Sequence, residues 1–219
     1  MSTIFKFVIL TFILYLMSTN QLFAQQDSVK YDLDFKFNDG FFLDFNQVRS
    51  NQAIPFKNII TNNNTDLFLE KLTNIPSFML FVNGEKKNIE TKNIWGYAKN
   101  DVIYIQYNKK FYRVPSIGSI SFFVANIEVQ YQTGMNPWNN SFYGTQGQSY
   151  TTDELHQFLI DFKTGTLYEY SIKSIEKLIS FDKELFTEYT KLKKRKQKQL
   201  SFIYIRRFNE SHPLYFPNN

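Results

Sequence analysis

Apolar and polar residues alternate in short runs through most of the first 170 positions, and turn-forming residues separate these runs. Between positions 29 and 37, apolar side chains alternate with charged ones, which is typical of a strand with one buried face. Asn38-Asp39-Gly40 then predicts a turn, and the apolar run 41–45 predicts a returning strand. Further strands are predicted at 77–82, 94–97, 102–107, 111–114, 117–124, 127–131, 157–162 and 166–170.

The period of the pattern changes from two residues to 3.6 after the last predicted strand. Ser174 can cap a short helix, and Asp182 can cap a second one. The second helix has an apolar stripe at i, i+4 and i+7, formed by Leu185, Tyr189 and Leu192. The stripe can be followed to residue 208, which allows one helix of about 25 residues over 182–208. The alternative is a break near Gln199 followed by a strand over 200–208.

These elements predict a β-rich α+β fold. We expect antiparallel strands over 25–170 to form a meander or an open barrel, with helices over 171–210 packed on it and a docked tail over 211–219. The chain is long enough to bury a sizeable core as a single domain. A hydrophobic content of 43%, with 24 Phe and 14 Tyr, argues against an intrinsically disordered protein. The absence of cysteine excludes a disulfide-stapled scaffold.

The first 24 residues have the layout of a secretory signal peptide. One cation, Lys6, precedes an apolar run over 7–17, and Ala24 ends the polar stretch that follows. The apolar run would form about 16 Å of helix, roughly half the thickness that a membrane-spanning helix must cross. We therefore predict cleavage after Ala24 and a soluble mature chain, 25–219, in the periplasm or outside the cell. The lack of cysteine excludes a lipoprotein, and no later run is long enough for a transmembrane span.

Cations are concentrated in one C-terminal segment, although the formal net charge of the whole chain is only +5. Eight Lys and Arg residues lie between positions 191 and 207 with no acidic residue among them. Six of these are the candidate anion-binding residues: Lys191, Lys193, Lys194, Arg195, Lys196 and Lys198. Such a run attracts polyanions, and the predicted partner is an anionic envelope surface, since export argues against nucleic acid. The alternative is a solvated face of a long helix, where the dipole favours cations in the C-terminal half.

Groups that could carry catalysis are few. The chain has no cysteine, two histidines, and no CxxC or HExxH spacing, so neither a metal site nor a cofactor is predicted. The densest titratable cluster is Asp153, Glu154 and His156, in which either carboxylate could orient the imidazole as a general base. No Gly-x-Ser-x-Gly elbow supplies a nucleophile, which favours a surface role for His156. The run Asp161-Phe162-Lys163-Thr164-Gly165 predicts a hairpin turn rather than a phosphate loop.

A stretch rich in Gly, Asn, Ser and Gln over 133–152 predicts a long loop. Trp138 and Tyr143 lie within it. Exposed aromatic rings stack on sugars and on aromatic ligands at binding sites, so these two residues are the candidate ligand-binding residues. The alternative is that both rings cover the core.

Four segments spread along the chain together resemble one group of proteins. They are Asp39-Gly40 with 41–48, Trp95-Gly96-Tyr97 followed by 102–114, the segment 158–170 around Asp161-Phe162-Lys163-Thr164-Gly165, and the segment 207–217. Together they resemble a group of uncharacterised exported proteins of bacteroidete bacteria, over most of the mature chain. The group has no assigned activity, so the resemblance implies a bacterial exported protein and transfers no catalytic residue.

Three functional hypotheses follow from the sequence. The first is a non-catalytic exported module that binds or scaffolds in the bacterial envelope, because catalytic groups are scarce and aromatic residues abundant. The second is a hydrolase of unrecognised type that uses His156 with Asp153 or Glu154. The third is attachment to an anionic surface through the basic segment 191–198, and another envelope protein is the remaining candidate partner.

Overall fold

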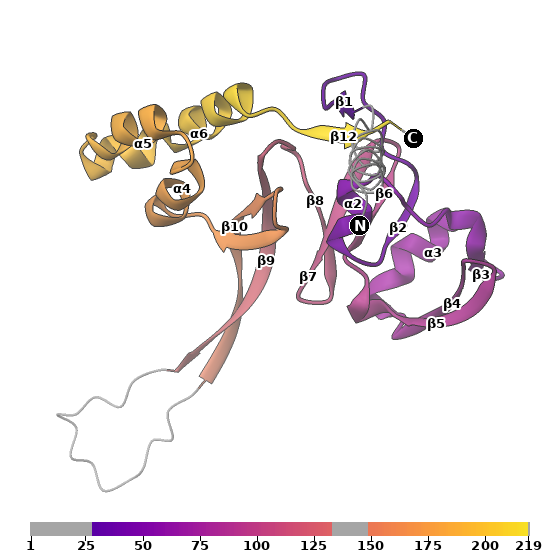
Figure 1. Cartoon of the computed structure of the whole chain (residues 1–219). Helices are drawn as coiled ribbons and strands as arrows, with labels where there is room; N and C mark the ends of the chain where they lie inside the picture. The colour runs from indigo at the N-terminus through magenta and orange to yellow at the C-terminus, as the bar shows by residue number, and fades with distance from the viewer. Residues whose placement is uncertain (1–27, 133–148, 219) are drawn as a thin grey trace, which may run out of the picture.

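The computed structural model describes residues 28–132 and 149–218, and it shows an α+β fold of antiparallel sheets (Figure 1). The sheets do not close into a barrel, and the C-terminal helices pack on them, so the predicted fold class is confirmed. The strands are β1 (Ser28–Lys30), β2 (Gly40–Phe42), β3 (Ile59–Ile60), β4 (Ser77–Val82), β5 (Glu85–Glu90), β6 (Gly96–Lys99), β7 (Val102–Tyr107), β8 (Lys110–Arg113), β9 (Ile120–Gln132), β10 (Ser149–Asp161), β11 (Thr166–Glu169) and β12 (Tyr215–Pro217). The α-helices are α2 (Phe45–Arg49), α3 (Thr65–Lys71), α4 (Ile172–Ile179), α5 (Lys183–Thr190) and α6 (Lys194–Ser211).

The central sheet has the strand order β2-β6-β7-β8 and is antiparallel throughout. Its buried side chains include Phe42, Ala98 and Ile103, which belong to one core cluster with Phe123 and Phe158 of the β9–β10 hairpin. Full burial of an apolar side chain such as Phe or Ile contributes about 1.5–3 kcal/mol. The cluster therefore joins the central sheet to the hairpin.

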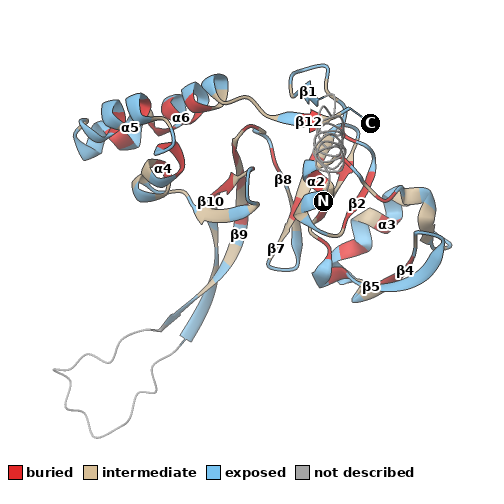
Figure 2. Ribbon diagram, viewed as in Figure 1, coloured by how far each residue is buried: buried red, intermediate tan, exposed pale blue. Residues whose placement is uncertain are grey.

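The β9–β10 hairpin lies between the central sheet and the helices. Its register runs from Ile120 opposite Asp161 to Gln132 opposite Ser149. At its base both faces are buried, because Phe158 belongs to the sheet core whereas Leu159 belongs to the helical core. Its outer half extends away from the rest of the molecule and is largely exposed (Figures 1 and 2). The prediction of two separate strands over 117–131 is wrong because β9 is continuous.

A smaller sheet, β3-β4-β5, lies with α3 at the opposite end of the molecule from α5 and α6 (Figure 1). Helix α3 begins after Asn64, whose side-chain oxygen accepts the Leu67 N–H at 2.9 Å. The buried Phe68 ring of α3 packs edge-on against Phe78 of β4, with ring centroids 5.2 Å apart. This contact holds the helix on the sheet.

Three C-terminal helices, α4 to α6, cover the face of β9–β10 that points away from the central sheet. Ser171 and Asp182 cap α4 and α5 through their side chains, so the predicted cap at Asp182 is confirmed and the one at Ser174 is displaced. Asn209 of α6 fixes the helix to the hairpin, because its amide accepts the Ile120 N–H at 2.7 Å and donates to the Ile120 carbonyl at 2.9 Å. Within the described parts of the chain, none of the helices combines the length and the hydropathy needed to cross a bilayer.

Both alternatives for 182–208 are wrong, the single long helix and the break near Gln199 followed by a strand. The chain leaves α5 after Thr190 and starts α6 at Lys194, with Lys193 in an extended conformation between them. No glycine or proline marks this break. Its cause is tertiary, because Tyr189 of α5 and Gln197 of α6 are both buried and hydrogen-bond to each other across the junction.

The N-terminal alternation is a strand only at its start. β1 pairs with β12 and ends at Lys30, after which the Asp32 carboxylate accepts the Asp34 N–H at 3.0 Å and closes a turn. The turn leaves the Leu33 side chain 99% exposed. The predicted strand over 29–37 is therefore wrong beyond Lys30, although three of its aromatic residues still pack in or against the core: Tyr31, Phe35 and Phe37.

Candidate functional site

The six cations predicted to bind anions gather at the junction of α5 and α6. Lys191 is the C-cap of α5, Lys193 is the N-cap of α6, and the other four lie in the first two turns of α6. All six side chains are exposed. Among the residues that the structure describes, none of the six forms an ion pair with an acidic side chain. The junction is therefore a surface of uncompensated positive charge.

The polarity of α6 adds to this charge. The helix has no side-chain cap at Lys193 and no acidic residue in its first turn. The first backbone N–H groups of a helix lack intrahelical acceptors, and the helix dipole is positive at this end. The sequence also allowed a solvated helix face whose cations the dipole favours; the dipole part is wrong for the five cations from Lys193 onward, because they stand at the N-terminus of α6, and only Lys191 is at a helix C-terminus.

Buried hydrogen bonds hold the basic junction in place. The Gln197 side-chain amide donates to Glu176 of α4 at 2.9 Å and to the Tyr189 carbonyl at 3.1 Å. The Tyr189 hydroxyl in turn lies 3.0 Å from the Ser201 hydroxyl and donates to the Gln197 carbonyl at 3.2 Å. A buried network whose members all have partners rigidifies its surroundings. The first turns of α6 therefore display their cations from a fixed backbone.

Arg207, near the other end of α6, does not add to the uncompensated positive charge of the junction. Its guanidinium donates to both carboxylate oxygens of Glu188 at 2.8 and 2.6 Å, and the Tyr204 hydroxyl donates to the same carboxylate at 2.8 Å. Hydrogen bonds from Arg207 and then from Tyr204 lower the pKa of Glu188 to about 2. The pair joins α5 to α6 and neutralises both charges.

The predicted catalytic cluster is only partly assembled. His156 Nε2 lies 3.3 Å from Glu154 Oε2, and the Tyr131 hydroxyl donates to the other oxygen of Glu154. Asp153 points to the opposite face of β10, because neighbouring residues of a strand alternate. The hydrogen bond from Tyr131, followed by the one from His156, holds the pKa of Glu154 below its ordinary value. Glu154 is thus suited to orienting His156 and not to donating a proton near neutral pH.

Aromatic side chains mark the outer end of the β9–β10 hairpin. Tyr131 and Tyr150 face each other across the strands, with ring centroids 5.5 Å apart and planes 22° from parallel. They are 40% and 54% exposed. Trp138 and Tyr143, the candidate ligand-binding residues, lie outside the described residues. The tyrosine pair was missed from the sequence because Tyr150 falls inside the predicted loop 133–152, whereas residues 149–152 belong to strand β10.

Two surface cavities adjoin the C-terminal tail. One, of about 710 Å³, lies between α6 and the turn after β1, and its lining includes three cations and three acidic residues. The other, of about 440 Å³, is lined by Arg49 and Lys163 and by no acidic residue. Neither is lined by His156. Within 28–132 and 149–218, no three His, Cys, Asp or Glu side chains gather as metal ligands would.

Comparisons with known proteins add no functional information. No protein-family model matches the sequence, no curated protein matches it, and no solved structure matches the fold. Function must therefore be inferred from the chain's own residues and their geometry.

Proposed function

We propose that this protein is a non-catalytic, exported binding module of the bacterial envelope that attaches to an anionic lipid surface through the basic segment 191–198. One observation carries the proposal. The six cations of that segment are exposed and have no acidic partner among the described residues, and five of them stand at the positive end of α6. A site of this kind favours anionic groups twice, through the side chains and through the helix terminus.

The exposed surface of the segment is cationic rather than amphipathic. Leu192 is half-buried and Gln197 is buried, so the side chains between the cations point into the protein. A helix that lies in a membrane interface needs an apolar face, which this segment lacks. Attachment is therefore electrostatic. Each Lys or Arg close to an anionic leaflet contributes about 1 kcal/mol, which suits reversible binding by several cations together.

Export is proposed from the leader-like segment 1–24, which lies outside the described residues. Mass spectrometry of the N-terminus of the protein recovered from native cells tests it. We expect a chain that begins at Gln25, and a chain that retains Met1 would contradict export through this segment.

Binding to lipid vesicles tests the attachment itself. We expect the mature chain to co-sediment with phosphatidylcholine vesicles that contain phosphatidylglycerol, and not with pure phosphatidylcholine. Raising the ionic strength shortens the Debye length from about 30 Å at 0.01 M to about 8 Å at 0.15 M, so binding should fall steeply over this range. Binding that is absent, or that does not change with salt, would remove the proposal.

A further inference from the structure

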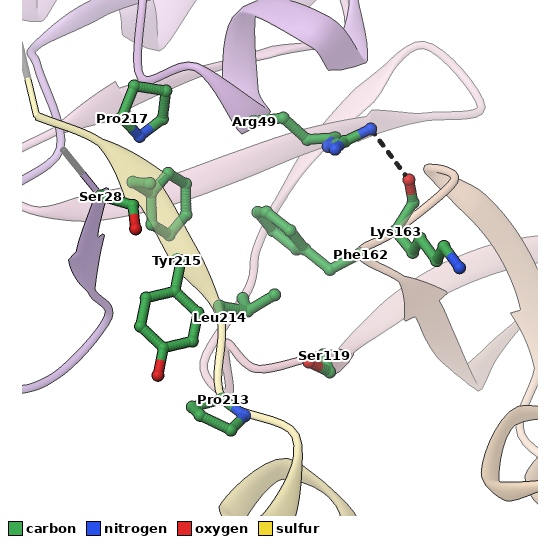
Figure 3. Close-up of a pocket in the computed structure, with 10 residues that line it drawn as sticks. Ser28, Arg49, Ser119, Phe162, Lys163, Pro213, Leu214, Tyr215 and Pro217 are labelled. Carbon is green, nitrogen blue, oxygen red and sulfur yellow. Dashed lines mark hydrogen bonds between the residues drawn. The ribbon is translucent and has the colours of Figure 1, made fainter. Parts of the chain in front are cut away.

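The 440 Å³ cavity is built where five distant parts of the chain meet (Figure 3). Its lining comes from β1, the end of α2, the residue before β9, the β10–β11 turn, and the C-terminal strand β12 with the residues before it. The volume falls within the range of small-molecule sites, roughly 300–1,000 Å³. None of the lining residues belongs to the basic segment 191–198, so a ligand in this cavity would bind independently of the proposed attachment to lipid.

Arg49 is the principal charged group of this cavity. Its guanidinium donates a hydrogen bond to the Lys163 carbonyl at 3.1 Å, and it has no acidic partner within ion-pair distance among the described residues. A guanidinium has five N–H donors in a planar fork. Most of them are therefore available to a ligand, on a side chain whose orientation is already set.

The partner of Arg49 is itself held rigidly. The Asp161 carboxylate accepts the Lys163 N–H at 3.0 Å, and the Asp161 carbonyl accepts the Gly165 N–H at 2.7 Å. Gly165 has φ +75°, and a Cβ at that position would lie 2.5 Å from the Phe45 ring of α2. The predicted hairpin turn thus packs directly on α2, which fixes the Lys163 carbonyl beside Arg49.

Two of the lining side chains near Arg49 are apolar, Phe162 and Leu214, and only an edge of Phe162, which is 5% exposed, is accessible. Figure 3 shows the Phe162 ring directed from the turn toward the tail, with Leu214 beside it. The Lys163 ammonium turns away and lies 5.4 Å from the centre of the Phe181 ring. A single anchored guanidinium beside an apolar wall matches a ligand with one anionic group on an apolar body. Arg and carboxylate bind through two parallel hydrogen bonds, which makes a carboxylate the best fit.

We propose that this cavity binds a carboxylate carried on an apolar body, with Arg49 holding the carboxylate, and with Leu214 and the exposed edge of Phe162 contacting the apolar part. Two sources supply this chemistry: a free aromatic or aliphatic acid, and the C-terminal residue of a peptide.

The test is an NMR titration of the ¹⁵N-labelled mature chain with 3-phenylpropionate and with N-acetylphenylalanine. We expect both to shift the Arg49 side-chain resonance and the backbone resonances of Ser119 and Leu214. Neutral 3-phenylpropanol should bind at least about tenfold more weakly, because it lacks the charge-assisted hydrogen bonds. Tighter binding of N-acetylphenylalanine assigns the site to a chain end, and tighter binding of 3-phenylpropionate assigns it to a free acid.

Arg49→Gln should weaken 3-phenylpropionate binding about tenfold. Arg49 is exposed, so the variant should keep the resonance dispersion of the natural fold. Arg113→Gln removes the same charge from an exposed residue of β8 that does not line the cavity, and it should leave binding unchanged. The proposal fails if neither acid binds, if the alcohol binds as well as the acid, or if Arg49→Gln has no effect.

Discussion

Replacing Lys193, Lys194 and Arg195 by glutamine should weaken binding to phosphatidylglycerol vesicles about 100-fold at low salt. Each cation near an anionic leaflet contributes about 1 kcal/mol, so three contribute about 3 kcal/mol. Since about 1.4 kcal/mol is a tenfold change in affinity, the loss is about 100-fold. All three side chains are exposed at the start of α6, and glutamine is a good helix former, so the helix should persist. Co-sedimentation over a range of lipid concentrations measures the change.

The same variant should be slightly more stable than the natural chain. Cations at a helix N-terminus oppose the helix dipole, so their removal relieves a repulsion that the natural sequence retains. Thermal unfolding at low salt measures this difference, which should shrink as salt is added. Weaker binding together with unchanged or higher stability would show that these cations serve attachment rather than folding.

A matched control removes three cations elsewhere. Lys86, Lys87 and Lys92 are exposed on and after β5, at the opposite end of the molecule from α5 and α6 (Figure 1). Their replacement by glutamine lowers the net charge by the same amount. If this control loses binding as strongly as the α6 variant, attachment depends on net charge and the proposed location of the site is wrong.

Elements with strong local signals could be predicted from the sequence. Strands β4 and β7 begin and end where their apolar runs do. The turn after β4 is Asn83-Gly84, and both residues have positive φ, 53° and 82°, as a tight hairpin turn requires. The cap at Asp182 could be predicted for the same reason, since it depends on the residues next to it. Local patterns were sufficient here because the decisive contacts join neighbours in the chain.

Elements that depend on distant contacts could not be predicted. Nothing in residues 191–193 disfavours a helix, and the break there follows from the buried contact of Tyr189 with Gln197 and Ser201. Likewise, the alternation after Lys30 has the period of a strand, yet those residues turn and pack against the C-terminal strand. The spacing of apolar residues indicates which side chains will be buried. It does not indicate which part of the chain they will pack against.

The candidate functional residues likewise include some that the sequence indicates and some that only the structure reveals. The basic run could be found from composition alone, whereas its position at the start of a helix needed the structure. The cavity around Arg49 had no sequence signal, because Arg49 and Lys163 are 114 positions apart. The sequence therefore indicates the basic surface but not the cavity, which long-range packing creates.

Phe216→Ala should destabilise the protein by about 3–5 kcal/mol, as expected for the truncation of a fully buried phenylalanine. Phe216 lies in the three-residue strand β12 near the C-terminus and is only 1% exposed. Its ring stacks on Phe35 at 4.5 Å between centroids and meets Phe37 and Phe162 edge-on at 5.4 and 5.7 Å. One side chain thus joins the segment after β1, the β10–β11 turn and the tail.

Equilibrium unfolding in urea measures the loss, and Tyr215→Ala is the control. Tyr215 is in the same strand but is 57% exposed, so its truncation should cost less than about 1 kcal/mol. A cost below about 1 kcal/mol for Phe216→Ala as well would show that β12 is not part of the cooperative fold. The expected large cost would instead mean that the tail, which continues directly from α6, helps to hold the helices against the sheets. The basic segment would then be displayed from a fixed position relative to the β-sheet core.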